Sequence, residues 1–131
     1  MNSQTAPTTH PFHLEDDDHP HEECGVFGII GDGDAATHTV LGLHALQHRG
    51  QEAAGIVTYD GQQFHSHRGL GHVAENFNDE VTSRLKGHIA VGHNRYATTG
   101  GTILRNVQPL FAEYEFGGFA VGHNGNITNA E

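Results

Sequence analysis

The sequence predicts an α+β fold, in which antiparallel strand pairs and helices occupy separate stretches of the chain. Two pairs of strand-like segments, at 53–68 and 109–123, are each joined by a short turn that contains glycine. Apolar residues recur at helical spacing in 35–47 and again in 73–86. Because strands joined by tight turns are antiparallel, these observations indicate the α+β class.

The first strand and the first helix follow each other directly. Residues 26–30, Val-Phe-Gly-Ile-Ile, form an apolar run typical of a buried strand, and Gly-Asp-Gly-Asp at 31–34 predicts a turn. The helix at 35–47 is expected to begin near Asp34, a good N-cap residue, and to end at His48-Arg49-Gly50, where basic residues precede a glycine. Its apolar face consists of Ala36, Val40, Leu43 and Leu46.

The remaining elements are predicted from the same signals. They are strands at 53–59 and 62–68 around an Asp60-Gly61 turn, one or two short helical pieces in 73–86, a strand at 88–93, and strands at 109–116 and 119–123 around Gly117-Gly118. Asn124-Gly125, a strong turn signal, ends the second pair. Residues 128–131 have the spacing of a capping box. A helix should follow that box, so we expect the chain to be truncated or a fragment of a longer reading frame.

The composition limits the classes of partner. Sixteen Asp and Glu against six Lys and Arg give a formal net charge of −10, so nucleic acid is not expected to be a partner. No apolar stretch approaches the ~20 residues that span a bilayer, so no membrane partner is expected. One cysteine among 131 residues excludes an intramolecular disulfide and fits a reducing compartment. We therefore expect one small domain in the cytoplasm.

Residues 1–23 form an acidic leader without Lys or Arg. The leader has too few apolar side chains to offset its ordering entropy and is predicted to be disordered, and it lacks the basic and apolar regions of a secretory signal. Histidines among its carboxylates could in principle bind a transition metal, although their spacing matches no defined ligand set. They are His10, His13, His19 and His21. We assign no metal site, and a metal-binding or interaction protein built on the leader stays as a non-enzymatic alternative.

The only cysteine, Cys24, lies where the leader meets the first apolar run. A cysteine is nucleophilic as the thiolate, and at a pKa of about 8.5 only a few per cent is ionised near pH 7. If Cys24 were the first residue, its own α-amino group, with a pKa of about 7.7–8.0, would be a base tethered to the nucleophile. On this stretch alone, a small buried hydrophobic residue beside Val, Phe and Ile explains the cysteine adequately. The motifs further along favour the nucleophile.

Four motifs lie in order along the chain. They are ECGVFG at 23–28, LQHRGQEAAGI at 46–56, GHNRYAT at 92–98 and GHNGNITN at 122–129. Each one is weak alone, but the four together closely resemble the class II glutamine amidotransferase domain of the amidophosphoribosyltransferases. The resemblance runs without obvious interruption from Cys24 to Glu131.

The resemblance implies a fold and its boundaries. The fold is that of the N-terminal nucleophile hydrolases, a four-layer αββα sandwich of two β-sheets between helices, here incomplete at its C-terminal end. Residues 24–131 would be the N-terminal part of a truncated class II glutamine amidotransferase domain. Residues 1–23 would be a propeptide, removed by cleavage between Glu23 and Cys24. The uncut chain would be inactive because the leader holds its general base as an amide.

The resemblance also implies the reaction. Glutamine would be hydrolysed through a Cys24 thioester, and its ammonia passed to phosphoribosyl pyrophosphate to give 5-phosphoribosylamine, the first step of de novo purine (IMP) biosynthesis. Asn124 and Gly125 match the oxyanion hole, which would use the Asn124 side-chain amide and the Gly125 backbone N–H. Losing one such donor typically costs ~3–4 kcal/mol of transition-state stabilisation.

Three more residues match supporting positions of the family. Arg95 matches the arginine that pairs with the α-carboxylate of the substrate, a task suited to a planar, bidentate guanidinium. Thr98 lies where a hydroxyl helps to hold the same carboxylate. Arg49 matches an arginine near the strand of the nucleophile, and we assign it a role in organising the site.

Other parts of the family's enzymes would lie downstream of residue 131. They are the aspartate that binds the substrate α-amino group, the phosphoribosyltransferase domain and the cysteines of an iron–sulfur cluster. No cofactor is expected within this chain, and Mg²⁺ would accompany phosphoribosyl pyrophosphate in the missing part. We expect the fragment alone to be inactive and the full-length protein to be a homo-oligomer.

The nearest alternative is another class II amidotransferase, such as glucosamine-6-phosphate synthase. Such an enzyme has the same glutaminase chemistry and a different ammonia acceptor. HRGQE at 48–52 and Tyr96 favour the purine enzyme, because the aminosugar enzymes usually have Tyr-Arg-Gly-Tyr-Asp and Trp at those places.

Overall fold

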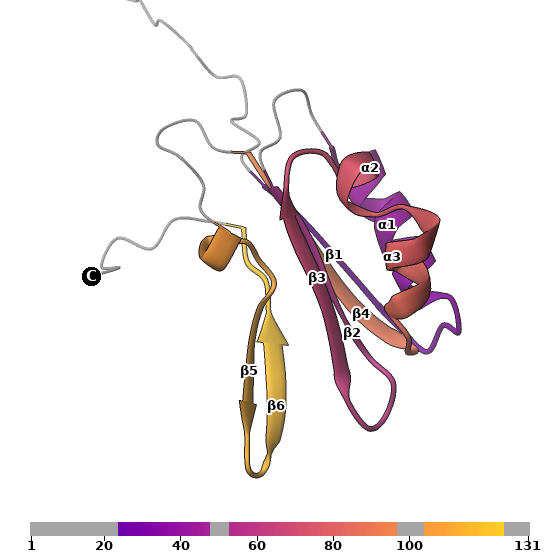
Figure 1. The fold of residues 1–131 in the computed structure, drawn as a ribbon, viewed down its shortest axis with the longest axis vertical. Helices are drawn as coiled ribbons and strands as arrows, with labels where there is room; N and C mark the ends of the chain where they lie inside the picture. The colour runs from indigo at the N-terminus through magenta and orange to yellow at the C-terminus, as the bar shows by residue number, and fades with distance from the viewer. Residues whose placement is uncertain (1–23, 48–52, 97–103, 125–131) are drawn as a thin grey trace, which may run out of the picture.

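The computed structural model describes residues 24–47, 53–96 and 104–124 (Figure 1). In chain order its elements are β1 (Cys24–Ile30), α1 (Ala35–Ala45), β2 (Ala53–Tyr59), β3 (Phe64–Leu70), α2 (Val73–Asn76), α3 (Asp79–Arg84), β4 (Ile89–Arg95), the 3-10 helix η1 (Leu104–Asn106), β5 (Leu110–Tyr114) and β6 (Gly117–Val121). Every strand pair is antiparallel. The predicted α+β class is therefore confirmed.

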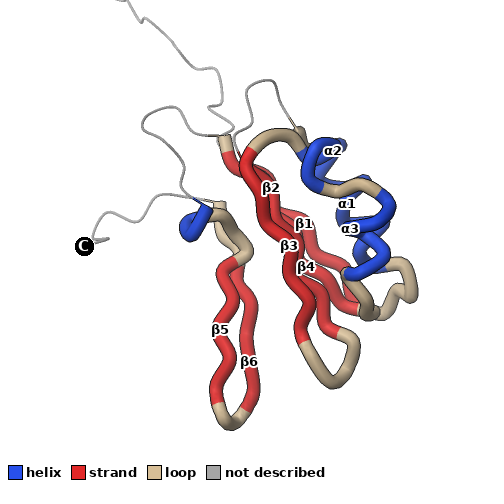
Figure 2. Tube along the Cα trace, in the orientation of Figure 1, coloured by secondary structure: helices blue, strands red, loops and turns tan. Residues whose placement is uncertain are grey.

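A four-stranded sheet with the order β1-β4-β2-β3 forms the centre of the structure. β4 is the last of these strands in the sequence, yet it lies between β1 and β2 and pairs with both. Three of the four sequence motifs supply these strands, so residues that are far apart in the chain become neighbours in the sheet (Figures 1 and 2).

Helices α1, α2 and α3 cover one face of this sheet (Figure 1). Alternate strand residues face them, and Ala54 and Ile56 of β2 and Ala90 of β4 pack with Leu43 of α1. Burying one large apolar side chain stabilises the fold by about 1.5–3 kcal/mol. The buried cluster consists of Ala35, Ala36, Leu43, Ala54, Ile56, Val73, Phe77, Leu85 and Ala90.

The β5–β6 hairpin and the segment before it lie on the opposite face of the sheet (Figures 1 and 2). The Phe64 ring of β3 packs against the Phe111 ring of β5, with centroids 4.9 Å apart. Gly118 of β6 comes so close to Phe64 that an added Cβ would lie 2.9 Å from the ring. The described residues thus form three layers: helices, a four-stranded sheet and a two-stranded hairpin.

Helix α1 is shorter than the predicted helix. Asp34 is its N-cap residue, as predicted, but the Asp34 side chain makes no capping bond, and its backbone N–H donates to Asp32 Oδ1 at 2.7 Å instead. The helix ends at Ala45, and the Gln47 N–H bonds back to the His44 carbonyl, a tightened final turn. Leu46 is 39% exposed, so it does not belong to the apolar face.

The other helical and strand predictions hold with small shifts. The segment 73–86 forms two short helices, α2 and α3, as expected. The strand predicted at 88–93 runs instead from Ile89 to Arg95. Arg95 is therefore the last residue of β4, where the ladder fixes its backbone.

The turn of the first hairpin is longer than predicted. β2 ends at Tyr59 and β3 begins at Phe64, so four residues connect them instead of Asp60-Gly61 alone. Asp60 Oδ1 accepts from the backbone N–H groups of Gln62 and Gln63, each at 2.8 Å. The Gln63 N–H, with the His65 ring and the Gln62 N–H, lowers the pKa of Asp60 to about 2. The Asp60 carboxylate thus satisfies the N–H groups of Gln62 and Gln63, which a two-residue turn would have placed in the β2–β3 ladder.

The turn of the second hairpin lies two residues earlier than predicted. Tyr114 pairs with Gly117, so Glu115 and Phe116 form the turn, and Gly117 and Gly118 belong to β6. Gly117 has a φ of 130°, which a side chain would strain. Gly117 is needed for its positive φ and Gly118 for the close approach of Phe64, although neither residue forms the turn itself.

Several predictions fall on residues outside the described ranges. They concern the leader at 1–23, the helix end at His48-Arg49-Gly50 and the capping box at 128–131. In the part of the chain that the structure describes, no helix has the length and apolarity needed to cross a membrane.

Candidate functional site at one end of the sheet

Cys24 and Arg95 are direct partners across two strands. The β1–β4 register pairs Cys24 with Arg95, and the β4–β2 register pairs Arg95 with Ala53. These residues therefore form one row at the end of the sheet where β1 begins and β4 ends. Side chains in such a row lie on the same face of the sheet. The predicted nucleophile and the predicted carboxylate-binding arginine are thus neighbours.

The neighbouring row shows which face that is. Gly25 and Asn94 pair with each other, and the Asn94 side chain donates from Nδ2 to the Leu43 carbonyl of α1 at 2.9 Å. Asn94 therefore faces the helices. Because successive strand residues alternate between faces, Cys24 and Arg95 face away from the helices, on the side where the β5–β6 hairpin lies.

Asn94 and Gly25 fix the beginning of β1. The Leu43 carbonyl belongs to the last turn of α1, where no intrahelical donor is available, so the buried Asn94 amide satisfies it. A Cβ on Gly25 would collide with Asn94 Oδ1 and lie 2.9 Å from the Leu46 Cβ. Glycine next to Cys24 therefore allows the strand that carries the nucleophile to pack closely on the helix end.

His93 brings the third predicted site residue to the same face. His93 lies two residues before Arg95 on β4 and pairs with Val26 and Gly55. Its side chain is fully buried, and Nε2 lies 3.0 Å from the backbone carbonyl oxygen of His123. Asn124 is the next residue in the chain. The chain just after β6 therefore lies beside His93, two residues along β4 from Arg95.

The surroundings of His93 disfavour the charged form of its ring. Burial lowers the pKa of His93 below 6.5, and the charges near it, on His123 and Arg95, lower it further, whereas the bond to the His123 carbonyl opposes this. A carbonyl oxygen only accepts, so Nε2 carries a proton and donates to the His123 carbonyl.

Three of the residues expected at the site lie within the described ranges: Cys24 and Arg95 are ladder partners, and Asn124 directly follows His123, which bonds to His93. Cys24 is half-buried, Arg95 is also half-buried, and Asn124 is exposed. The other four, Glu23, Arg49, Thr98 and Gly125, lie outside the described residues. His93, Asn94 and Gln108 were not predicted as parts of the site. The signal for His93 and Asn94 is the alternation of faces in β4, which can be used only once the register is known. No signal in the sequence points to Gln108.

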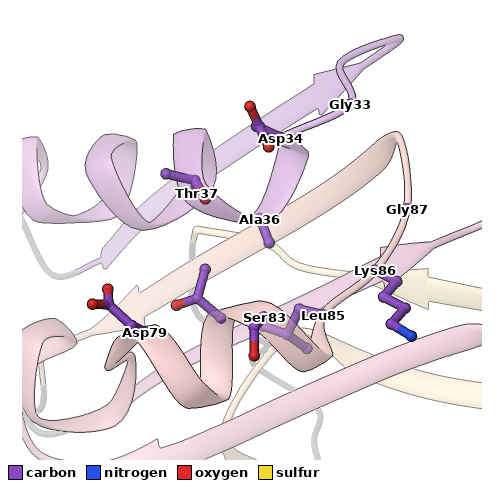
Figure 3. A pocket seen from close by; sticks show the side chains of 10 residues that line it. Gly33, Asp34, Ala36, Thr37, Asp79, Ser83, Leu85, Lys86 and Gly87 are labelled. Atoms are coloured by element: carbon purple, nitrogen blue, oxygen red, sulfur yellow. The ribbon is translucent and has the colours of Figure 1, made fainter.

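A separate cavity of about 360 Å³ lies at the opposite end of the sheet. Figure 3 shows its lining side chains, which come from the start of α1, from α3 and from the connection into β4. That end is marked by Gly31, whose N–H donates to the His88 carbonyl at 2.7 Å. The cavity is therefore remote from Cys24. Within 24–47, 53–96 and 104–124, no three His, Cys, Asp or Glu side chains gather as a metal site would require.

Comparison with known proteins gives close relatives. The chain is 58% identical to an amidophosphoribosyltransferase of Rhizobium etli over 128 residues, which cover 97% of this chain and 25% of that enzyme. It is 52% identical to a chloroplastic amidophosphoribosyltransferase of Vigna aconitifolia, over 93% of this chain and 25% of that enzyme. No family model matches the chain.

Two solved structures share the fold. One, a glutamine phosphoribosylpyrophosphate amidotransferase from B. subtilis complexed with ADP and GMP, is 48% identical with a TM-score of 0.71, over 79% of this chain and 22% of that one. The other, described as the allosteric regulatory enzyme of purine biosynthesis, is 49% identical with a TM-score of 0.69, over 72% of this chain and 21% of that one.

The predicted family is thus confirmed, and the aminosugar alternative is not favoured. The chain spans about a quarter of the length of the curated relatives that it matches. With 58% identity over nearly its whole length, and with the fold of the solved enzymes, the chain is similar to a part of the amidophosphoribosyltransferases.

Proposed function

We propose that this chain carries the glutaminase half of an amidophosphoribosyltransferase. Glutamine is hydrolysed at Cys24, and the ammonia reacts with phosphoribosyl pyrophosphate, bound by the rest of the protein, to give 5-phosphoribosylamine and pyrophosphate. This is the first step of de novo purine biosynthesis. The observation that carries the proposal is the pairing of Cys24 with Arg95 across β1 and β4, with Asn124 held at the same end of the sheet.

In the proposed reaction, Cys24 acts with its own α-amino group. Cleavage of the Glu23–Cys24 bond frees that amine, which takes the thiol proton as Sγ attacks the amide carbon of glutamine. The amine returns the proton to the departing nitrogen, the C–N bond breaks, and ammonia leaves a thioester. Water then attacks the thioester, which releases glutamate and restores the thiol.

The neighbouring residues orient and stabilise the substrate. Arg95 binds the α-carboxylate of glutamine, with the Thr98 hydroxyl in support, and Arg49 helps to organise the site. The Asn124 side-chain amide and the Gly125 N–H donate to the tetrahedral oxyanion, whose negative charge exists only in the intermediates and transition states. Hydrogen-bond donors that already point to the position of this charge usually make the largest single contribution to the rate of acyl transfer.

We also propose that the three layers belong to the four-layer αββα sandwich of the N-terminal nucleophile hydrolases. In this arrangement, β5 and β6 begin a second sheet on the face that carries Cys24. The exposure of large apolar residues on the hairpin supports this, since Phe116 is 91% exposed and Phe119 is 51% exposed. Further strands and a second helix layer would cover such residues.

Residues 1–23 are proposed to be a propeptide, and residues 24–131 the N-terminal part of the glutamine amidotransferase domain. We expect the active protein to begin at Cys24, because only a free α-amine can serve as the base. Terminal-peptide mass spectrometry of the natural protein measures this. The matched comparison is the uncut chain, in which the leader holds the α-amine of Cys24 as an amide. Rapid glutamine hydrolysis by a chain that still starts at Met1 or Asn2 would overturn the proposal.

The cofactors of the family cannot be placed on the described residues. An iron–sulfur cluster takes four cysteine ligands, and the chain has one cysteine. Such a cluster, and the Mg²⁺ that would accompany phosphoribosyl pyrophosphate, are proposed to be bound by the rest of the protein. We propose that the whole protein is a homo-oligomer in the cytoplasm, a location that the single cysteine of residues 1–131 fits. The Vigna aconitifolia relative, by contrast, is chloroplastic.

The acceptor experiment tests the proposed function directly. The whole protein is supplied with glutamine and either phosphoribosyl pyrophosphate or fructose 6-phosphate, and glutamate, pyrophosphate and the amino product are measured. We expect pyrophosphate release that matches glutamate formation with the first acceptor only. Amination of fructose 6-phosphate, or no glutamate formation with either acceptor, would contradict the proposal.

A further inference from the structure

The backbone of His123 is held from both sides. Its carbonyl oxygen accepts from the Nε2 of His93 at 3.0 Å, and its N–H donates to the Oε1 of Gln108 at 2.7 Å. His93 belongs to the central sheet, whereas Gln108 belongs to the segment between η1 and β5. Two side chains from different elements thus hold both backbone polar groups of His123, and the next residue is Asn124.

The His93 side of this clamp is rigid. The residue is 0% exposed, on the inner strand β4. Its Nδ1 is also buried and has no hydrogen-bond partner among the residues that the structure describes. Among the described residues, the bond to the His123 carbonyl is therefore the one hydrogen bond that holds the ring.

The Gln108 side is anchored through its backbone. Val107 and Pro109 are buried on either side of it, and the Val107 carbonyl accepts from Arg68 Nη1 at 3.0 Å. The Gln108 carbonyl lies against Gly55 of β2, where an added Cβ would collide with it. Gly55 is itself the partner of His93 across β2 and β4. Both halves of the clamp therefore rest on the same pair of strands.

We propose that His93 and Gln108 are positioning residues of the glutaminase reaction. By holding both polar groups of the His123 backbone, they fix the direction in which the chain leaves β6 and so place the Asn124 amide against the intermediate formed at Cys24. This inference rests on the proposed function. Neither side chain needs to touch glutamine, and both act through Asn124.

The test uses the whole protein, processed to begin at Cys24, in two pairs of variants. His93→Leu removes the donor, whereas the amide nitrogen of His93→Gln can reach the same carbonyl. Gln108→Met removes the acceptor, whereas Gln108→Glu keeps it. Gln108 is only half-buried, so its variants test the proposal even if His93→Leu does not fold. His65→Leu, which breaks a histidine bond to Asp60 in the first hairpin, is the matched control.

Three readouts separate positioning from general damage: kcat and KM for glutamine, the rate at which iodoacetamide alkylates Cys24, and the thermal midpoint. Alkylation requires the thiolate and no oxyanion hole. We expect His93→Leu and Gln108→Met to lower kcat about 10- to 100-fold, because a misplacement of about 1 Å can cost about 10²-fold. KM and the alkylation rate should stay within about threefold, and His93→Gln and Gln108→Glu should recover most of the kcat.

The outcomes distinguish a failure of the positioning role from a failure of the proposed function. Two results would overturn the positioning role and leave the proposed function intact. One is a kcat in His93→Leu and Gln108→Met that equals the wild-type value. The other is a fall in kcat with equally large changes in KM and in the alkylation rate, which His93→Gln and Gln108→Glu do not rescue. A wild-type protein that does not hydrolyse glutamine would overturn both.

Discussion

Replacing Cys24 by alanine is expected to abolish glutamine hydrolysis, with a fall in kcat of about 10⁴-fold or more. The Cα position in the β1–β4 ladder and the α-amino group both remain in this variant, so only the sulfur is lost. Without Sγ no thioester can form, and the base has no nucleophile to activate. The measurement is glutamate formation from glutamine by the whole, processed protein.

The same variant should still make 5-phosphoribosylamine when ammonium salts replace glutamine, because the proposed second half-reaction needs ammonia and not its source. Val26→Ala is the matched control, since Val26 lies on the same face of β1 two residues further on and is 39% exposed. The Cys24→Ala variant should therefore lose one activity and keep the other. Glutaminase activity above a tenth of the wild-type value would rule out Cys24 as the nucleophile.

The strands and helices were predictable where a local pattern determines them. The helical apolar spacing in 73–86 and the continuous apolar run in 26–30 both correspond to observed elements. The hairpin turns were predicted less well, because each depends on contacts from elsewhere. Gly117 and Gly118 resemble a turn locally, but the closeness of Gly118 to Phe64 requires glycine within the strand. Tertiary packing decided that position.

The candidate site was predictable only through the family resemblance. No local pattern indicates that Cys24 faces Arg95, because their pairing depends on β4 inserting between β1 and β2. The clamp around His123 is harder still to predict, since it joins Gln108 to a strand through Gly55. No local pattern indicates that His93 is buried or that it bonds to the carbonyl just before Asn124.

The alternation of faces divides the family motif on β4 between two tasks. Asn94 points to the helices and satisfies the end of α1, whereas His93 and Arg95 point to the side of Cys24. Adjacent residues of one motif therefore serve stability and chemistry separately. A substitution at Asn94 should lower the free energy of unfolding by about 1–3 kcal/mol, because the buried Leu43 carbonyl loses its donor. A substitution at Arg95 should act on substrate binding.

For Arg95→Ala we expect the KM for glutamine to rise about 10- to 100-fold, because a hydrogen bond to a charged group contributes about 1.5–3 kcal/mol. The kcat should change much less, since the carboxylate is bound equally in the ground state and the transition state. The KM of Arg95→Lys should lie between those of the wild type and Arg95→Ala, because lysine keeps the charge but loses the bidentate geometry. The measurement is the initial rate of glutamate formation against glutamine concentration, with the exposed Arg84→Ala as the control.

A substrate without the carboxylate makes this test specific. 4-Aminobutanamide has the reacting amide of glutamine and lacks its α-carboxylate, so wild type and Arg95→Ala should hydrolyse it with equal, low kcat/KM. A general distortion of the β1–β4 edge would instead lower the activity on both substrates by similar factors. Because Arg95 is the ladder partner of Cys24, such distortion is the main rival explanation. Equal loss on both substrates would show that Arg95 supports the nucleophile's strand and does not bind the carboxylate.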